Sequence, residues 1–188
     1  MNTINRILTN EEIQMLKEIL NKELIKFKHE QMIYINSVYK DLFFEIDKSF
    51  FDIRNNFEVI NYFGDKEEVS FISLIPVKEK DVKSELKDTP MITTNVSEII
   101  KSIEIVNEKQ KYSSSKGEDY ELLFTRAIVF NTETQKYILE KDIWLSERII
   151  FERGNEYYKT LIADYEHSDN DSFDDGPITI ERNIVTIE

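Results

Sequence analysis

The chain has 188 residues, 40% hydrophobic and 32% charged, with 12 Phe, 9 Tyr and no Cys. That much apolar material can form a core, which excludes global disorder, and the lack of Cys excludes disulfides, thiolate zinc ligands and a Cys nucleophile. Residues 1–90 carry 17 acidic and 13 basic side chains and residues 91–188 carry 20 and 11, for a net charge of −13. Because this charge repels phosphates and anionic lipid, we expect no direct binding to nucleic acid or to a membrane.

The first ten residues lack the basic start and apolar block of a signal peptide, and no apolar run is long enough to cross a bilayer. A chain without Cys also suits a reducing compartment. The sequence therefore predicts a cytoplasmic protein.

A helix is predicted from about residue 10 to residues 29–31. Thr9 and Glu12 have the spacing of a capping box, in which each side chain binds the backbone amide of the other residue. An apolar stripe then recurs at helical spacing, formed by Ile13, Leu16, Leu20, Leu24 and Phe27.

Between residues 31 and 77 the apolar period changes to two, which predicts strands at 32–35, 42–46, 50–53, 57–60 and 69–75. Short polar or glycine-containing pairs at 47–48, 55–56 and 64–65 suit turns. Connections this short join antiparallel strands, so we expect a meander. Residues 78–90 are predicted to be a charged connector.

A second helix is predicted at residues 96–106, after a cap at Asn95 to Glu98. Its apolar stripe consists of Val96, Ile99, Ile100, Ile103 and Val106. Residues 111–119 are predicted to form a loop, and strands follow at 122–130, 136–145, 148–153, 157–165 and 178–187. Gly154 and Asn155 suit a two-residue hairpin turn before the fourth of these strands. Part of 138–150 also fits a helical period, and we interpret it as strand.

These elements predict an α+β fold, a mainly antiparallel, meander-like sheet with two amphipathic helices packed on it. We expect one compact domain over residues 1–188. Two helix-plus-meander units at 1–78 and 91–188, joined by the charged connector 79–90, remain an alternative. No matching residues establish an internal repeat.

Several segments match part of a catalytic motif, but the residues that would complete each motif are missing. Ser-Ser-Ser-Lys at 113–116 and Ser-Asp-Asn at 168–170 belong to a serine-enzyme set whose third element, Lys-Thr-Gly, is missing. His-Glu at 29–30 begins a zinc motif, but Ile33 stands where the second His is required. The four glycines are isolated, so no phosphate-binding loop is present. We expect no catalytic residue, no cofactor and no metal site.

Residues 164–176 stand out, because they contain six acidic side chains and no Lys or Arg. An EF-hand starting at Asp169 fails, since Asp174 replaces the required Gly at its sixth position and Ile180 replaces the final Glu. Crowded carboxylates are relieved by a cation, a basic partner or water. On a strand, adjacent tyrosines point to opposite faces, so one of Tyr157 and Tyr158 should be exposed near this acidic segment.

We therefore expect a non-enzymatic, acidic protein-binding module, such as an inhibitor or immunity-type protein, that docks on a basic partner protein. Its oligomeric state is left open. The predicted partner-binding residues are Asp169, Asp171, Asp174, Asp175, Tyr157 and Tyr158. One alternative is a metal-dependent hydrolase that uses carboxylates of the 164–175 segment, with Asp164, Glu166, Asp169 and Asp171 as oxygen ligands. Another is a structural or assembly subunit.

Overall fold

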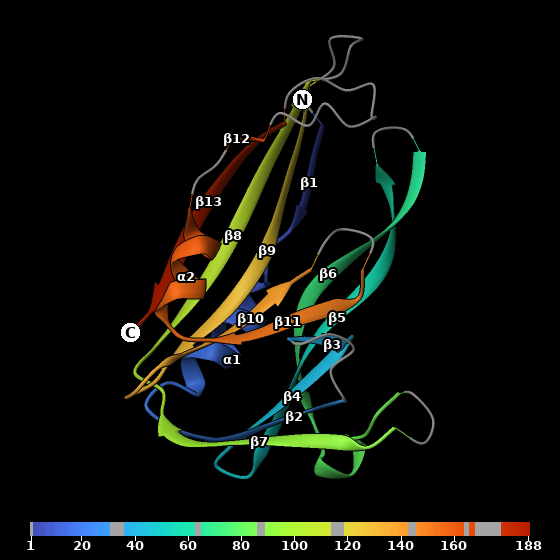
Figure 1. Cartoon of the computed structure of the whole chain (residues 1–188). Helices are drawn as coiled ribbons and strands as arrows, with labels where there is room; N and C mark the ends of the chain where they lie inside the picture. Colours follow the sequence, from blue (N-terminus) through green and yellow to red (C-terminus); the bar gives the residue numbers. More distant parts are fainter. Residues whose placement is uncertain are drawn as a thin grey trace.

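The computed structural model describes residues 2–30, 36–62, 65–85, 89–113, 119–142, 146–163, 166–167 and 178–188. Within them the chain forms thirteen strands in two sheets and two α-helices, α1 (Asn10–Glu18) and α2 (Asn155–Ile162) (Figure 1). A 3-10 turn, η1, covers Glu79–Asp81. The strands are β1 (Asn2–Arg6), β2 (Glu23–Glu30), β3 (Ser37–Tyr39), β4 (Asp41–Ile46), β5 (Ser49–Tyr62), β6 (Asp65–Val77), β7 (Met91–Ile99), β8 (Ser102–Ser113), β9 (Asp119–Asn131), β10 (Lys136–Lys141), β11 (Arg148–Arg153), β12 (Glu166–His167) and β13 (Ile178–Ile187).

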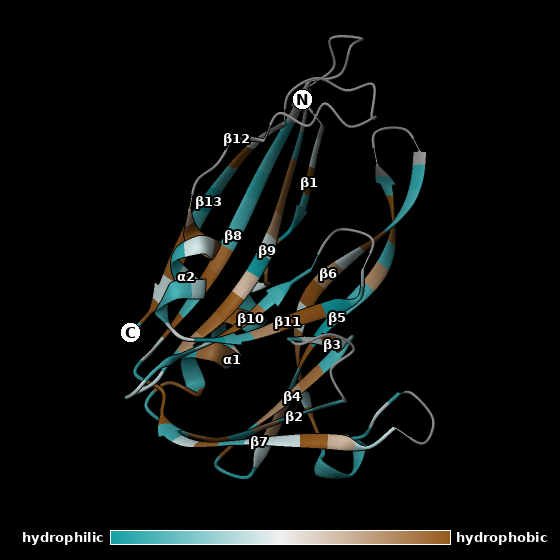
Figure 2. Cartoon of the chain, viewed as in Figure 1, coloured by the Kyte–Doolittle hydropathy of each residue, from teal (hydrophilic) through white to brown (hydrophobic). Residues whose placement is uncertain are grey.

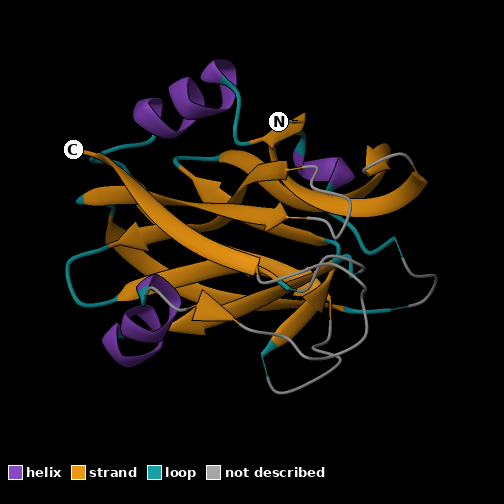
Figure 3. Cartoon of the chain, turned by 90° about the horizontal axis from the view of Figure 1, so that it is seen from above, coloured by secondary structure: helices purple, strands orange, loops and turns teal. Residues whose placement is uncertain are grey.

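The larger sheet has the order β12-β13-β8-β9-β10-β11-β3, and β1 joins it by parallel pairing with β9. The smaller sheet has the order β6-β5-β4-β2-β7, with antiparallel pairing throughout. The two α-helices lie on opposite sides of the strands (Figure 3). The prediction of an α+β fold with two amphipathic helices packed on one sheet is therefore wrong, because the described chain is predominantly β.

Residues 96–106, which were predicted to form a helix, instead form the end of β7 and the start of β8. Ile103 and Ile105 are buried on either side of Glu104, which is a period of two that the helical prediction overlooked. The segment is also rich in β-branched residues, which favour strands.

The first helix begins as predicted but ends early. The Thr9 hydroxyl accepts a hydrogen bond from the Glu12 amide (3.2 Å), and the Glu12 carboxylate accepts one from the Thr9 amide (2.7 Å). The helix stops at Glu18, and Asn21 takes a left-handed conformation with φ 61°. Leu24 and Phe27, which continued the helical stripe in sequence, are buried in β2.

Residues 155–162 form helix α2, so the predicted strand at 157–165 and its hairpin turn are wrong. Gly154 precedes the helix with φ 92°, a left-handed value that favours Gly. The apolar side chains from Tyr157 to Ile162 recur at helical spacing and pack on the sheet as one stripe.

In the first half of the chain, the turn at Asp47 and Lys48 is confirmed, and both residues have positive φ. Strand β5 runs unbroken through Asn55, so the predicted turn at residues 55–56 is wrong. The Asn55 amide group is buried and donates to the backbone carbonyls of Ser146 (2.9 Å) and Arg148 (3.0 Å), a long-range pairing with no local signature. The connector at 78–90 contains the short turn η1 and no strand among its described residues.

The largest cluster of buried apolar side chains draws on both sheets. Phe27 of β2 lies within it, with ring centroids 4.8 Å from Phe151, 5.4 Å from Tyr137 and 6.3 Å from Phe130 of the larger sheet. β6 and β11 both contribute residues to this cluster, and both carry hydrophobic segments in Figure 2. The choice between one domain and two units stays a prediction. Neither helix in the described part of the chain is long and apolar enough to cross a membrane.

Candidate functional site

Of the six predicted partner-binding residues, Tyr157 and Tyr158 lie in the first turns of α2. Asp169, Asp171, Asp174 and Asp175 lie outside the described residues, as does Asp164 of the alternative metal site. The candidate site therefore comprises α2 and the part of the larger sheet that this helix covers.

Helix α2 is fixed by apolar packing on one face of the larger sheet. Leu161 is buried, and Tyr157, Tyr158 and Ile162 pack beside it. The sheet contributes small and β-branched residues from three neighbouring strands, namely Val106, Ala127, Val129 and Ile138. The helix thus rests on an apolar surface of the sheet.

Both tyrosine hydroxyls point inward to carboxylates of the sheet. The Tyr157 hydroxyl donates to Glu140 of β10 over 2.5 Å, and the Tyr158 hydroxyl donates to Glu104 of β8. Burial, reinforced by these carboxylates, raises the pKa of Tyr157 and of Tyr158 above the usual range. On a helix both rings are half-buried, so the expectation of one core tyrosine and one exposed tyrosine is wrong.

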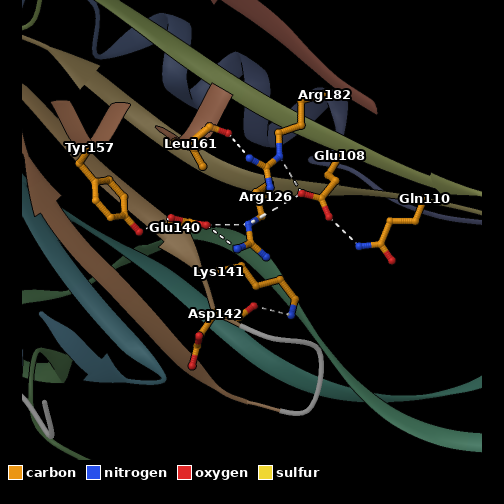
Figure 4. Close-up of polar contacts among 9 residues, drawn as sticks. All are labelled: Glu108, Gln110, Arg126, Glu140, Lys141, Asp142, Tyr157, Leu161 and Arg182. Atoms are coloured by element: carbon orange, nitrogen blue, oxygen red, sulfur yellow. Dashed lines mark hydrogen bonds and ion pairs between the residues drawn. The ribbon is translucent and has the colours of Figure 1, made fainter. Parts of the chain in front are cut away.

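Arg126 joins two carboxylates beneath the helix (Figure 4). The β8–β9 register shifts between Val106 and Asn107, and Arg126 is the extra residue of this bulge. Its Nε donates to Glu140 over 2.7 Å, and the same nitrogen lies 4.0 Å from Glu108. The β-bulge thus directs the Arg126 side chain toward Glu140 and Glu108, with which it forms a polar cluster.

Arg182 of β13 binds Glu108, which lies directly opposite it on β8. The Arg182 Nε to Glu108 Oε2 distance is 2.9 Å, and Gln110 donates to the other Glu108 oxygen over 2.6 Å. Arg182 also donates to the backbone carbonyl of Leu161 near the end of α2. A cation is favourable at that end of a helix, so Arg182 ties α2 to β13.

Lys141 completes the cluster and is 1% exposed. Its ammonium group donates to the backbone carbonyl of Asp142 over 3.3 Å. Burial, with a further contribution from the positive charge of Arg126, lowers the pKa of Lys141 to about 7. A neutral amine can act as a nucleophile or base, but a side chain this buried does not meet a dissolved substrate.

A second charged group lies on the smaller sheet. Arg54 of β5 donates to Asp41 over 2.6 Å, and its Nη2 lies 2.9 Å from Asp52. Burial and the charge of Asp41 raise the pKa of Asp52, to about 7. Elsewhere on this sheet, Ser84 of the 78–90 connector donates to the Glu30 carboxylate of β2. This contact joins the connector to the sheet.

Five residues of the polar cluster beneath α2 were not predicted from the sequence, namely Glu108, Arg126, Glu140, Lys141 and Arg182. A signal was present, because Arg126 interrupts an apolar strand and Glu140 follows the apolar run 137–139. What the sequence lacked was any indication that these strands lie side by side.

Among the described residues, no three His, Asp or Glu side chains lie in an arrangement that could hold a metal ion. The chain matches no protein-family model, no curated protein and no solved structure. Its function is therefore inferred from its own geometry and charge.

Proposed function

We propose that this protein is a non-enzymatic binding module that docks on a basic partner protein. The observation that carries the proposal is the position of α2, a helix anchored to the sheet from below and followed directly by the acidic segment 164–175. An anchored element that is followed in sequence by the strongest concentration of negative charge in the chain suits recognition of a cationic surface.

The carboxylates beneath α2 support this assignment because they are engaged inside the molecule. Glu140 binds Arg126 and Tyr157, and Glu108 binds Arg182. Their geometry stabilises the helix on its sheet and leaves partner contacts to the outer face of α2. On that face Glu156 and Lys159 are exposed.

Long-range attraction gives the mechanism of docking. A net charge of −13 draws a basic protein toward the surface, and the field is screened over about 8–10 Å at physiological salt. Such steering raises the association rate more than it slows dissociation. An inhibitor or immunity-type protein would neutralise its target in this way.

The test compares two charge-matched variants against a basic partner recovered by affinity capture from the native cell. The first changes Asp169, Asp171, Asp174 and Asp175 to Asn. The control changes four acidic residues outside this segment, Glu67, Glu68, Glu79 and Asp81, to Gln or Asn. We expect the first variant to associate more slowly and with a weaker dependence on salt, while both melt like the wild type.

Equal association rates for the two variants would show that the acidic segment is not part of the interface. A purified chain that carries a divalent cation, lost in the Asp→Asn variant, would contradict the proposal in favour of the hydrolase. Recovery of only further copies of the chain would contradict it in favour of the assembly subunit.

A further inference from the structure

Strand β13 lies near one end of the larger sheet, where β12 is the one strand among the described residues that pairs with its outer side (Figure 1). The short strand β12 covers only its start, at Ile178 and Thr179. From Glu181 to Ile187, no strand in the described part of the chain pairs with its outer side. In an antiparallel strand, alternate residues direct their N–H and C=O groups to each side, so this edge presents a row of backbone donors and acceptors.

Two edges of the smaller sheet are protected against strand pairing. On β6, the Leu74 amide donates to the Glu12 carboxylate of α1 over 2.8 Å, and Pro76 has no N–H to offer. On β7, the pairing with β2 shifts register between Leu24 and Lys26, and Ser97 has φ 55°. Folded proteins commonly use such features to prevent edge pairing.

β13 has none of these features. Its nine consecutive pairs with β8, from Thr179 to Ile187, run without a register shift. It contains no Pro, and no residue of β13 has positive φ. A long, regular and open edge is a template for another strand.

Within this otherwise largely polar edge, two neighbouring residues place an apolar side chain on each face. Ile184 lies opposite Val106 on the side of α2, and Val185 lies opposite Ile105 on the other side. They are 36% and 38% exposed. Beside Val185, a groove of about 450 Å³ opens between β13 and α1, lined by Ile13, Lys17, Leu20, Val185, Thr186, Ile187 and Glu188.

We propose that the β13 edge, from Glu181 to Ile187, binds an extended segment of a partner protein, which adds a strand to the larger sheet and places an apolar side chain in the groove beside α1. Only an extended backbone matches a row of strand N–H and C=O groups, so the occupant is a polypeptide in β conformation. The segment is basic, a point that rests on the proposed function.

Charge also argues against a second copy of the chain as the occupant. Two molecules that each carry −13 repel one another as they approach, whereas a Lys- or Arg-rich segment is attracted. β13 follows the acidic segment directly in sequence, so a partner drawn to that charge arrives near this edge.

The test selects binders from a displayed library of random peptides about ten residues long, the length of a β-strand. One selected peptide is synthesised, together with a version that is N-methylated at alternate residues and so lacks one row of N–H donors. Affinity is measured for the wild type, for Ile184→Gln/Val185→Gln and for the control Phe57→Gln/Val59→Gln. The control removes two exposed apolar side chains from β5, and neither variant changes the net charge.

We expect basic, β-branched peptides whose affinity falls roughly tenfold or more in the β13 variant and after N-methylation, but not in the β5 control. Amide hydrogen exchange should slow in β13 when the peptide is bound. Equal affinity for both variants, protection of another strand, or no enriched peptide would overturn the inference.

Further outcomes separate the two proposals. Basic peptides that bind away from β13 overturn strand addition and leave the basic-partner function standing. Peptides without basic residues that bind β13 contradict the basic-partner function and support strand addition at the β13 edge. A wild-type dimer in light scattering that Ile184→Gln/Val185→Gln dissociates would identify a second copy as the occupant and overturn the inference.

Discussion

The Tyr157 hydroxyl of α2 donates a 2.5 Å hydrogen bond to Glu140 of β10, whose other oxygen binds Arg126 of β9. One carboxylate therefore joins the helix to the bulge in the sheet. Because Glu140 is buried, the helix and the buried ion pair depend on each other.

Tyr157→Phe should lower the free energy of unfolding by about 1.5–3 kcal/mol, because it removes a hydrogen bond to a charged, buried group. Urea unfolding monitored by circular dichroism measures the change. Lys159→Ala on the exposed face of α2 is the control and should cost less than about 1 kcal/mol. A stability unchanged by Tyr157→Phe would show that the hydroxyl does not hold the helix.

Arg182→Met should cost about 3–5 kcal/mol, since it leaves the buried Glu108 carboxylate without its closest cation. Adding Glu108→Gln should recover part of this loss, which a double-mutant cycle detects. Lys101→Met breaks the exposed pair with Glu133 and should cost less than about 1 kcal/mol. If the Arg182 and Lys101 variants lose the same amount, the cluster beneath α2 is not a buried network.

Lys141→Met should remove a rise in stability at alkaline pH. The folded chain protonates Lys141 only below a pKa of about 7, whereas the unfolded chain does so up to its usual pKa of 10.5. The unfolded state therefore binds more protons between these values, and wild-type stability gains up to about 1.4 kcal/mol per pH unit. Urea unfolding from about pH 7 to about pH 9.5 tests this. The exposed Lys159→Met control should keep the wild-type slope, and a Lys141→Met slope like the wild type's would place the lysine in solvent.

Asp52→Asn should change the pH dependence of stability in the opposite sense, at lower pH. Burial raises the pKa of Asp52 from 3.8 to about 7, so the folded state binds more protons than the unfolded state in that window. Wild-type stability should therefore fall as the pH rises from about 4 to about 7 and then level off, by up to about 1.4 kcal/mol per pH unit. Asp52→Asn should remove this fall, whereas Asp81→Asn in the exposed turn η1 should preserve it. A stability difference between the wild type and the Asp52→Asn variant that stays constant across the window would contradict the raised pKa.

The sequence was sufficient to predict the structural features that depend on local interactions. The capping box of Thr9 and Glu12 spans three residues, and the turn at Asp47 and Lys48 joins adjacent strands. Strands β4, β9, β11 and β13 overlap predicted strands, because their own segments are rich in β-branched and aromatic residues. The net charge of −13, on which the proposed function rests, is likewise a property of the sequence alone.

Tertiary structure decided the rest, because burial against distant strands overrode ambiguous local periods. Residues 96–106 fit both a helix and a strand until pairing with β2 and β9 selected the strand. Glu108 and Arg182 are 74 residues apart in sequence and meet only because β13 pairs with β8. The open edge of β13 is decided in the same way, since an edge exists only once the order of strands in the sheet is known.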